Sequence, residues 1–406
     1  MRISTNMIFE MGSSKIGDLR ADLMKTQQQI STNTRVLTPA DDPIAAASAL
    51  GLNQAMSMNS QFATNRNNAK NSLGQEENIL QSVTDMLTSL KSVVVGAGNG
   101  SLSNDQRQTY LAQLNSSFDE LMGMANSRDE NGNYIFAGYQ TGTEPFTKSA
   151  TGATYNGDQG QRMLQVGPAR QMASSDSGSV VFEGGLTGNG RFVTSANAAN
   201  AGSGIISSGS VTNLAQLTGH DYSVAFAIDA ANVTTYTVTD NSTVPPTAVA
   251  TAQPYTSGQP IEFDGMRFDV EGKPANGDTF SVKPSTNESI FTTLTNLIAA
   301  ISLPATDADG QAKLTNFLNT ANDNLDNALQ NISAVRSTVG SRLNEIDSLD
   351  SVGSGLQIQY QQTLSDLVDI DPVEAYSRFT QQQFTLDAAQ KTFIKTAGLS
   401  LFDMLR

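Results

Sequence analysis

The stretch IGDLRADLMKTQQQISTNTRVLTPADDP, from Ile16 to Pro43, decides how the chain begins to fold. Apolar residues in its first half recur at three- and four-residue steps, the spacing with which a helix presents one apolar edge to a partner helix. These residues are Ile16, Leu19, Leu23 and Ile30. Its last two residues are Asp42, a good N-cap, and Pro43, which suits the first position of a helix. The stretch therefore predicts a helix, a break and the start of a second helix.

The C-terminal end of the chain has the same design. The sequence Asp369-Ile370-Asp371-Pro372 interrupts a helical pattern, with Asp371 as the expected cap and Pro372 as the expected first residue of the last helix. Beyond it, large and small apolar residues follow at roughly heptad positions. They are Tyr376, Phe379, Leu386, Phe393, Ala397 and Met404. We expect the helices of the two ends to pair and their apolar edges to form an assembly interface.

The middle of the chain has a different pattern. Helical spacing continues from Pro43 to the glycines near Gly98, resumes after a cap near Ser103, and changes near residue 126. Short alternating runs such as Tyr222 to Phe226 and Thr234 to Val238 then predict strands separated by tight turns. Helical spacing returns at Ile290 and is expected to continue to the break before the last helix.

The order of these patterns predicts an elongated α+β protein with a β-rich region inserted between paired helical ends. We expect terminal coiled-coil helices in residues 1–42 and 366–406. A helical bundle forming a rod is expected in residues 43–146 and 285–365, and a β-rich outer domain in residues 147–284.

Composition excludes several classes of function. The net charge of −15 argues against a nucleic-acid partner and against docking on anionic lipid, because both need clustered Lys and Arg. No apolar run is long enough for a membrane span, and the N-terminus lacks the apolar core of a cleaved signal peptide. With no cysteine and a single histidine, the chain has almost no ligands for zinc, so no cofactor or metal is expected.

The remaining candidates for chemistry have simpler explanations. His220 stands alone in a turn, without the partners that a catalytic histidine needs. The glycines between Gly184 and Gly190 lack the lysine of a phosphate-binding loop and are expected to form turns. A calcium site at Asp264, Asp269 and Asp278 would lack the spacing of an EF-hand. We therefore expect no catalytic residue.

The helical ends are expected to need partners. Full burial of one large apolar side chain contributes about 1.5–3 kcal/mol, whereas ordering a residue costs roughly 1–2 kcal/mol. If the N- and C-terminal helices pair only with each other, the residues outside their contact remain exposed to water. We therefore hypothesise that both ends are largely unfolded in the free subunit and order when neighbouring subunits join them.

The ends resemble those of the bacterial flagellin superfamily. Thr32 to Leu50, TNTRVLTPADDPIAAASAL, is similar to the flagellin segment that links the terminal helix to the next. Asn131 to Phe146, NGNYIFAGYQTGTEPF, and Asn276 to Val282, NGDTFSV, resemble the stretches that lead into and out of the outer domain of hook-associated members. The stretch Asp369 to Ala375 also resembles hook-associated members more than filament flagellins. Residues 1–146 and 276–406 carry the resemblance.

The resemblance implies a structural subunit at the junction between the flagellar hook and the filament. It implies a ring of copies with another hook-associated protein on the hook side and flagellin on the filament side. It also implies export by the flagellum's own type III apparatus without a cleaved signal peptide, with a cytosolic chaperone on the C-terminal helix. The expected location is the extracellular flagellum.

Three alternatives remain open from the sequence. A filament flagellin is the nearest one, and loss of a junction protein would differ from it by leaving hooks without filaments. A secreted enzyme with a catalytic insert would need a nucleophile and base, which the middle region lacks. A surface adhesin would concern only residues 147–275, whose Thr-rich strands are compatible with glycan contact.

Overall fold

The computed structural model describes residues 5–100, 102–303, 305 and 307–404, and the chain divides into two compact units. The terminal unit comprises Met1–Thr64 and Ser348–Arg406, and the central unit comprises Asn65–Asp347. Two long helices, α2 (Pro43–Ala97) and α6 (Ala308–Val368), contribute residues to both units.

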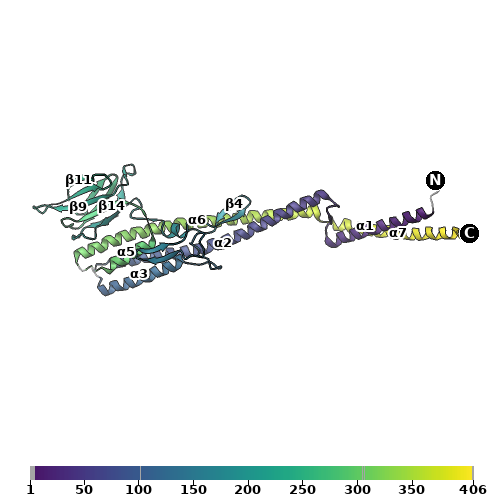
Figure 1. Ribbon diagram of the computed structural model, residues 1–406, viewed down its shortest axis with the longest axis horizontal. Helices are drawn as coiled ribbons and strands as arrows, with labels where there is room; N and C mark the ends of the chain where they lie inside the picture. The colour runs from purple at the N-terminus through teal and green to yellow at the C-terminus, as the bar shows by residue number, and fades with distance from the viewer. Residues whose placement is uncertain (1–4, 101, 304, 306, 405–406) are drawn as a thin grey trace. The chain divides into compact units, whose positions relative to one another are not determined.

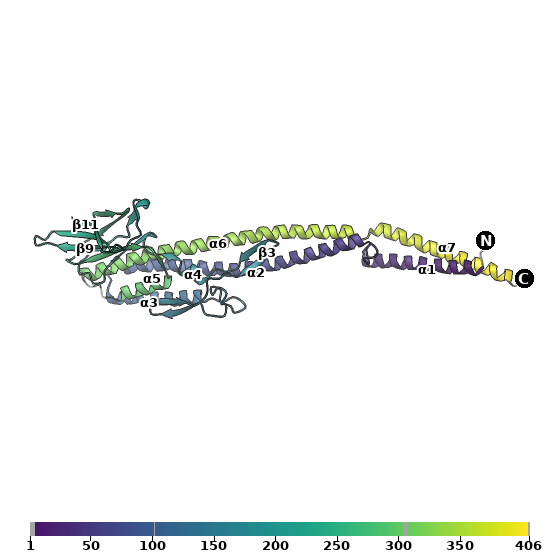
Figure 2. The ribbon, with the colours of Figure 1, turned by 45° about the horizontal axis from the view of Figure 1, so that its top comes forward.

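The terminal unit is helical in its described part. Helix α1 (Thr5–Thr32) and helix α7 (Pro372–Met404) lie side by side and antiparallel in both views (Figures 1 and 2). The beginning of α2 and the end of α6 form a second antiparallel pair in the same unit, where the Asn59 side chain donates to the backbone oxygen of Gly353 over 2.9 Å.

The helical part of the central unit gathers around an aromatic cluster. It contains α3 (Asn104–Ala125), the short α4 (Gly178–Phe182) and α5 (Ile290–Ser302), together with the adjoining parts of α2 and α6. Phe291 of α5 packs against rings from α3, from the first strand and from α4, with centroid separations of 5.1 to 6.1 Å. The cluster consists of Phe118, Phe136, Phe146, Phe182 and Phe291.

Local sequence explains where these helices begin and end. Ser103 caps α3 in a capping box, because its side chain accepts from the backbone of Gln106 while the Gln106 side chain accepts from the backbone of Ser103. The expectation of continuous helical structure from Ile290 to the last break is wrong, because α5 ends at Ser302 and α6 begins at Ala308. Leu303 is extended, the conformation that a residue before proline prefers, and the sequence has a proline at position 304.

Strands run from Phe146 to Glu288. The first ones are β1 (Phe146–Ser149), β2 (Gly152–Tyr155), β3 (Met163–Gly167), β4 (Arg170–Ala173), β5 (Gly185–Leu186), β6 (Phe192–Ala196), β7 (Ile205–Ile206) and β8 (Ser210–Val211). A 3-10 turn, η1 (Leu214–Gln216), precedes β9 (Tyr222–Ile228), β10 (Thr234–Asp240), β11 (Thr247–Pro254), β12 (Pro260–Phe263), β13 (Met266–Glu271), β14 (Thr279–Pro284) and β15 (Asn287–Glu288).

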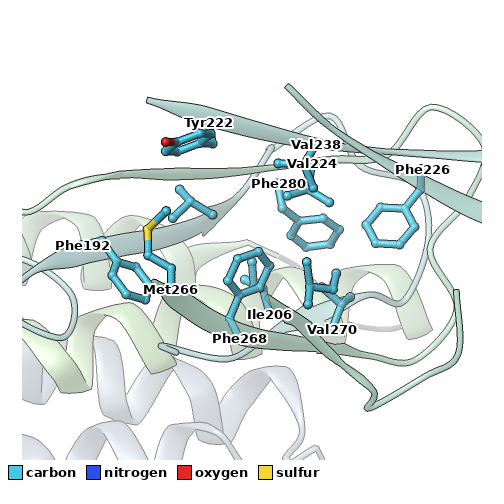
Figure 3. Packing of buried hydrophobic residues seen from close by; sticks show 12 residues of the cluster. Phe192, Ile206, Tyr222, Val224, Phe226, Val238, Met266, Phe268, Val270 and Phe280 are labelled. Atoms are coloured by element: carbon cyan, nitrogen blue, oxygen red, sulfur yellow. The ribbon is translucent and has the colours of Figure 1, made fainter. Parts of the chain in front are cut away.

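Two antiparallel sheets share one core in the β-rich region. The larger sheet has the order β11-β10-β9-β14-β6, and the smaller has the order β12-β13-β7, with β8 also paired to β13. Along β9 and β13 every second side chain is buried, as expected for strands with one face on a core. Tyr222, Val224 and Phe226 of β9 lie opposite Met266, Phe268 and Val270 of β13 in the cluster of Figure 3. The region is therefore a small β-sandwich with a core of its own.

The predicted α+β class, with helical ends and an inserted β-rich region, is confirmed. The sequence patterns near Gly98, Ser103 and residue 126 mark the end of α2, the beginning of α3 and the end of α3. Helix α4 and the turn η1 were not expected, because single helical turns carry too few residues for a period to be recognised.

Candidate assembly interface

The predicted N-terminal interface residues form one edge of α1. Ile16, Leu19, Leu23 and Ile30 are all half-buried, and the residues in phase with them, Thr26 and Gln29, are buried. Thr26 satisfies its hydroxyl within the helix by donating to the backbone oxygen of Asp22 over 3.1 Å. The structure therefore places all four predicted residues together along the side of α1 that is partly covered.

The partner edge of α7 includes three of the six predicted residues. Phe379, Leu386 and Phe393 are half-buried, and Ala375, one helical turn before Phe379, is fully buried on the same edge. Tyr376 lies one position away from this edge and is exposed. The predictions at Ala397 and Met404 fall outside the residues whose side chains the structure describes. Sequence reasoning missed Ala375, although its step of four before Phe379 was a usable signal.

Aromatic rings close the α1–α7 seam near the chain ends. The ring of Phe9 lies 5.1 Å from that of Phe393, centroid to centroid. A Cβ atom added at Gly12 would lie only 2.6 Å from Cδ2 of Phe393, so this glycine provides the space in which the ring sits. The contact depends on a residue without a side chain, which the apolar pattern of α1 does not reveal.

A hydrogen-bonded elbow joins the two ends where α1 and α6 stop. Thr34 pairs with Asp369 in an antiparallel bridge, and the backbone N–H of Arg35 donates to the oxygen of Val368 over 2.7 Å. The Arg35 guanidinium donates to the oxygen of Leu367 over 2.8 Å. Asn33 makes the turn after α1 with a φ of 55°, a left-handed conformation that asparagine tolerates better than most residues. The two breaks in the helical pattern are therefore neighbours in space.

Carboxylates define the helix starts at this elbow. The Asp42 side chain accepts from the backbone N–H of Ala45 over 3.0 Å at the start of α2, and this hydrogen bond lowers the pKa of Asp42. Asp371 accepts from the backbone N–H of Val373 over 2.8 Å at the start of α7. Pro43 and Pro372 are the first residues of the two helices.

Asp41 has a second role in the same turn. Its carboxylate bonds the Lys25 side chain and accepts from the backbone N–H groups of Leu37 and Thr38 over 3.1 and 2.8 Å. The hydrogen bonds from Lys25 and Thr38, that of Lys25 above all, lower the pKa of Asp41 to about 2. Asp41 thus ties α1 to the loop that follows it.

The terminal unit also exposes many large apolar side chains. Phe384 of α7 is 76% exposed and Ile44 of α2 is 81% exposed. The others in the described part of this unit are Met7, Phe9, Met11, Met24, Leu50, Met58, Val352, Leu356, Ile358, Val373, Tyr376 and Ile394. Large exposed apolar surfaces are typical of proteins that bind a partner there. We call these residues the exposed apolar set.

The other candidates for chemistry are hydrogen-bonded residues of the β-sandwich. Nδ1 of His220 is 2.7 Å from a carboxylate oxygen of Asp240. Asp278 is buried and accepts from three backbone N–H groups, whereas Asp264 accepts from the Tyr222 hydroxyl and Asp269 from the Ser207 hydroxyl. The described residues contain no group of three or more acidic, histidine or cysteine side chains placed to hold a metal ion. Among the helices described, none could cross a membrane.

Family models match most of the chain. Residues 3–141 match the bacterial flagellin N-terminal helical region, and residues 322–398 match the bacterial flagellin C-terminal helical region. Residues 195–284, which include most of the β-sandwich, match the D2-like domain of flagellar hook-associated protein 1.

Curated relatives match over the full length. Flagellar hook-associated protein 3 of Salmonella typhimurium is 30% identical over 407 residues, covering 100% of both chains. The protein of the same name from Escherichia coli is 29% identical, covering 100% of this chain and 99% of its own.

Solved structures agree with these relatives. Flagellar hook associated protein-3 of Legionella pneumophila superposes with a TM-score of 0.74 at 32% identity, covering 78% of this chain and 98% of its own. FlgL of Xanthomonas campestris superposes with a TM-score of 0.71 at 31% identity, covering 77% of this chain and 99% of its own.

Proposed function

This chain belongs to the flagellar hook-associated protein 3 (FlgL) family, and we infer from this that it is a structural subunit of the flagellum that connects the hook to the filament. In this role it seats the first flagellin subunits. Beyond family membership, the proposal rests on the exposed apolar set. These side chains lie in water within the subunit, and contact with another protein would bury them.

A subunit that connects the hook to the filament needs a binding partner on each side. Copies of this chain form a ring, with an adjacent hook-associated protein on the hook side and flagellin on the filament side. A cytosolic chaperone covers the C-terminal helix before export through the flagellar apparatus, which requires no cleaved signal peptide. The subunit carries no catalytic activity and no cofactor. Full-length similarity to flagellar proteins supports this proposal.

We also propose that three parts of the chain have different roles. Residues 1–42 and 366–406 make the coiled-coil contacts between subunits, residues 43–146 and 285–365 form the rod, and residues 147–284 form the outer domain. We propose that the terminal helices are largely unfolded in the free subunit and order on assembly, and the half-burial of Leu19, Leu23 and Leu386 supports this. Amide hydrogen exchange on the free subunit tests it, because strong protection across residues 1–35 and 380–406 would contradict it.

A deletion of the gene distinguishes the junction role from that of a filament flagellin. We expect cells without this protein to carry hooks but no filaments and to release unassembled flagellin into the medium. Cells that instead retain filaments, or that lose flagellin from the medium as well, would show that the chain is not the junction subunit.

A further inference from the structure

The central unit contains a buried carboxyl group that the assembly role does not use. Glu76 of α2 is 0% exposed, and one of its oxygens accepts from the backbone N–H of Asp176 over 3.1 Å. Its other oxygen, Oε2, is buried and has no hydrogen-bond partner. A carboxylate needs donors for both oxygens, so a site that offers one donor fits the neutral acid better than the anion.

A second buried carboxyl group lies beside it. Asp176 is buried and forms a two-pronged ion pair with Arg342 of α6, with nitrogen–oxygen distances of 2.9 and 3.1 Å. Gln161 also donates to Asp176, over 2.7 Å. Arg342 is therefore hydrogen-bonded to Asp176 and gives no hydrogen bond to the adjacent carboxyl group of Glu76 that would compensate its charge directly.

The other charged groups around Glu76 have partners of their own. On α2 and α6, Glu77 pairs with Arg336 over 2.7 Å. Arg162 is directed to Asp129, 3.9 Å away, and to the Ser175 hydroxyl. Burial, with the neighbouring charge of Asp176 as the next cause, raises the pKa of Glu76 to about 8. At neutral pH Glu76 therefore holds a proton in the folded state and loses it when the site opens to water.

The pair lies where an inserted segment meets the two long helices. This segment, residues 161–177, contains the β3–β4 hairpin, and we call it the hairpin segment. Asn65 of α2 donates to the oxygen of Gln165 over 2.8 Å, and Arg170 pairs with Glu345 of α6 over 2.6 Å. The hairpin segment is thus bound to α2 and α6 by these polar contacts, while its apolar side chains Val166 and Met172 are also buried. Glu76 and Asp176 lie at its buried end.

We propose that the buried Glu76–Asp176 pair is a proton-dependent latch that holds the hairpin segment on α2 and α6 and loosens it in alkaline solution. With Glu76 neutral, Asp176 keeps its ion pair with Arg342, and its backbone N–H donates to Glu76 without repulsion between two carboxylates. Ionisation of Glu76 places a second negative charge, with one oxygen unsolvated, against Asp176, and opening the segment to water relieves it. The inference does not depend on the partners proposed above.

Amide exchange of the full-length subunit at several pH values tests the latch. After correction for the intrinsic exchange rate, we expect the opening constant of residues 174–178 to rise with pH, by up to about tenfold per pH unit between pH 6 and pH 8. The direction follows from linkage, because the closed state holds a proton that the open state releases. An opening constant that stays level or falls over this range would overturn the proposal.

Three variants make the test specific. Glu76→Gln keeps the size and the hydrogen-bonding oxygen but cannot ionise, so its opening constant should remain level with pH. Glu77→Gln changes the next residue, whose partner is Arg336, and should keep the wild-type slope. Asp176→Asn removes the neighbouring negative charge and frees Arg342, so the pH dependence should move to lower pH.

Each result counts for or against the latch. A wild-type slope that survives in Glu76→Gln would assign the effect to another group and overturn the proposal. An Asp176→Asn variant whose transition moves upward would contradict the role of the second carboxyl group. Should Glu76→Gln fail to fold, the direction of the shift in Asp176→Asn still decides the matter.

Discussion

At the level of single residues, Asp41 does most to organise the turn between α1 and α2. Its carboxylate bonds a lysine of α1 and accepts from two backbone N–H groups of the loop, so it holds the loop against the helix. Thr34 in the same turn pairs with Asp369, so loss of the turn would also weaken the contact between the two chain ends.

The low pKa of Asp41 predicts acid sensitivity of this turn. The folded-state pKa lies below the ordinary value of 3.8, so the stabilisation is complete above that value and is lost as pH falls toward about 2. We expect a carbon-13 titration of the labelled side chain to report this value. The Lys25→Met variant should raise the pKa, since the Lys25 hydrogen bond is the largest cause, and an unchanged pKa would contradict the assignment.

Two glycines of α1 form a matched pair for testing the seam. Gly17 has open space where a Cβ would lie, whereas a Cβ at Gly12 would meet the ring of Phe393. Gly17→Ala should stabilise the helix by up to about 1 kcal/mol, because alanine loses less conformational freedom. Gly12→Ala should gain less or be destabilising, because the ring has to move. Protection of α1 amides in the assembled flagellum measures both, and equal effects would argue against the Phe393 contact.

At the level of elements, α7 presents two apolar edges on different sides. Phe379, Leu386 and Phe393 face the seam with α1, whereas Val373, Phe384 and Ile394 belong to the exposed apolar set. With 3.6 residues per turn, the two edges lie more than a quarter of a turn apart. One edge therefore serves the pairing of the chain's own ends, and the other is available for neighbouring subunits.

Substitutions at the adjacent positions 384, 385 and 386 of α7 can test the two edges separately. We expect Leu386→Asp to block incorporation into the flagellum, as Phe393→Asp should, because a charge in the seam loses its hydration without gaining a partner. Phe384→Asp should also block incorporation, because it charges the exposed edge. Thr385→Asp is the control, since Thr385 is exposed and lies on neither edge.

Counting filaments and measuring motility in complemented cells distinguishes the outcomes. Normal filaments with Leu386→Asp would refute the seam assignment, and normal filaments with Phe384→Asp would refute a subunit contact at the exposed edge. All four variants should keep the β-sandwich folded, because none of these residues lies in the central unit.

At the level of the whole molecule, each described unit has its own means of stability. The β-sandwich buries a complete core from residues 192–282, and the helical part of the central unit buries the aromatic cluster around Phe291. The terminal unit instead leaves much of its apolar surface in water. The apolar side chains of the first two cores are buried within the chain, whereas in our proposal those of the terminal unit are buried by neighbouring subunits.

Removal of the β-sandwich should leave assembly intact. Phe192 and Pro284 are partners in the register of β6 and β14, so a short glycine-rich turn can replace residues 193–283 without separating the chain ends. We expect the shortened protein to support filament growth, because the aromatic cluster and the exposed apolar set are untouched. Hooks without filaments, despite normal amounts of the shortened protein outside the cell, would show that the sandwich takes part in the junction.

The helical ends, the inserted strands and the breaks before Pro43 and Pro372 could all be predicted from the amino-acid sequence. These features follow from local periodicity and capping chemistry, which act between residues close together in the chain. The sequence also marked Leu19, Leu23 and Leu386, because a regular apolar edge is visible in one dimension.

Contacts between residues far apart in the chain became visible only in the folded structure. The place of Phe393 over Gly12, the joining of Thr34 to Asp369 and the burial of Glu76 beside Asp176 each bring together residues more than 90 positions apart. No local pattern encodes such contacts, because they depend on how completed helices and loops pack against one another. For the same reason the sequence could not separate the covered edge of α7 from the exposed one.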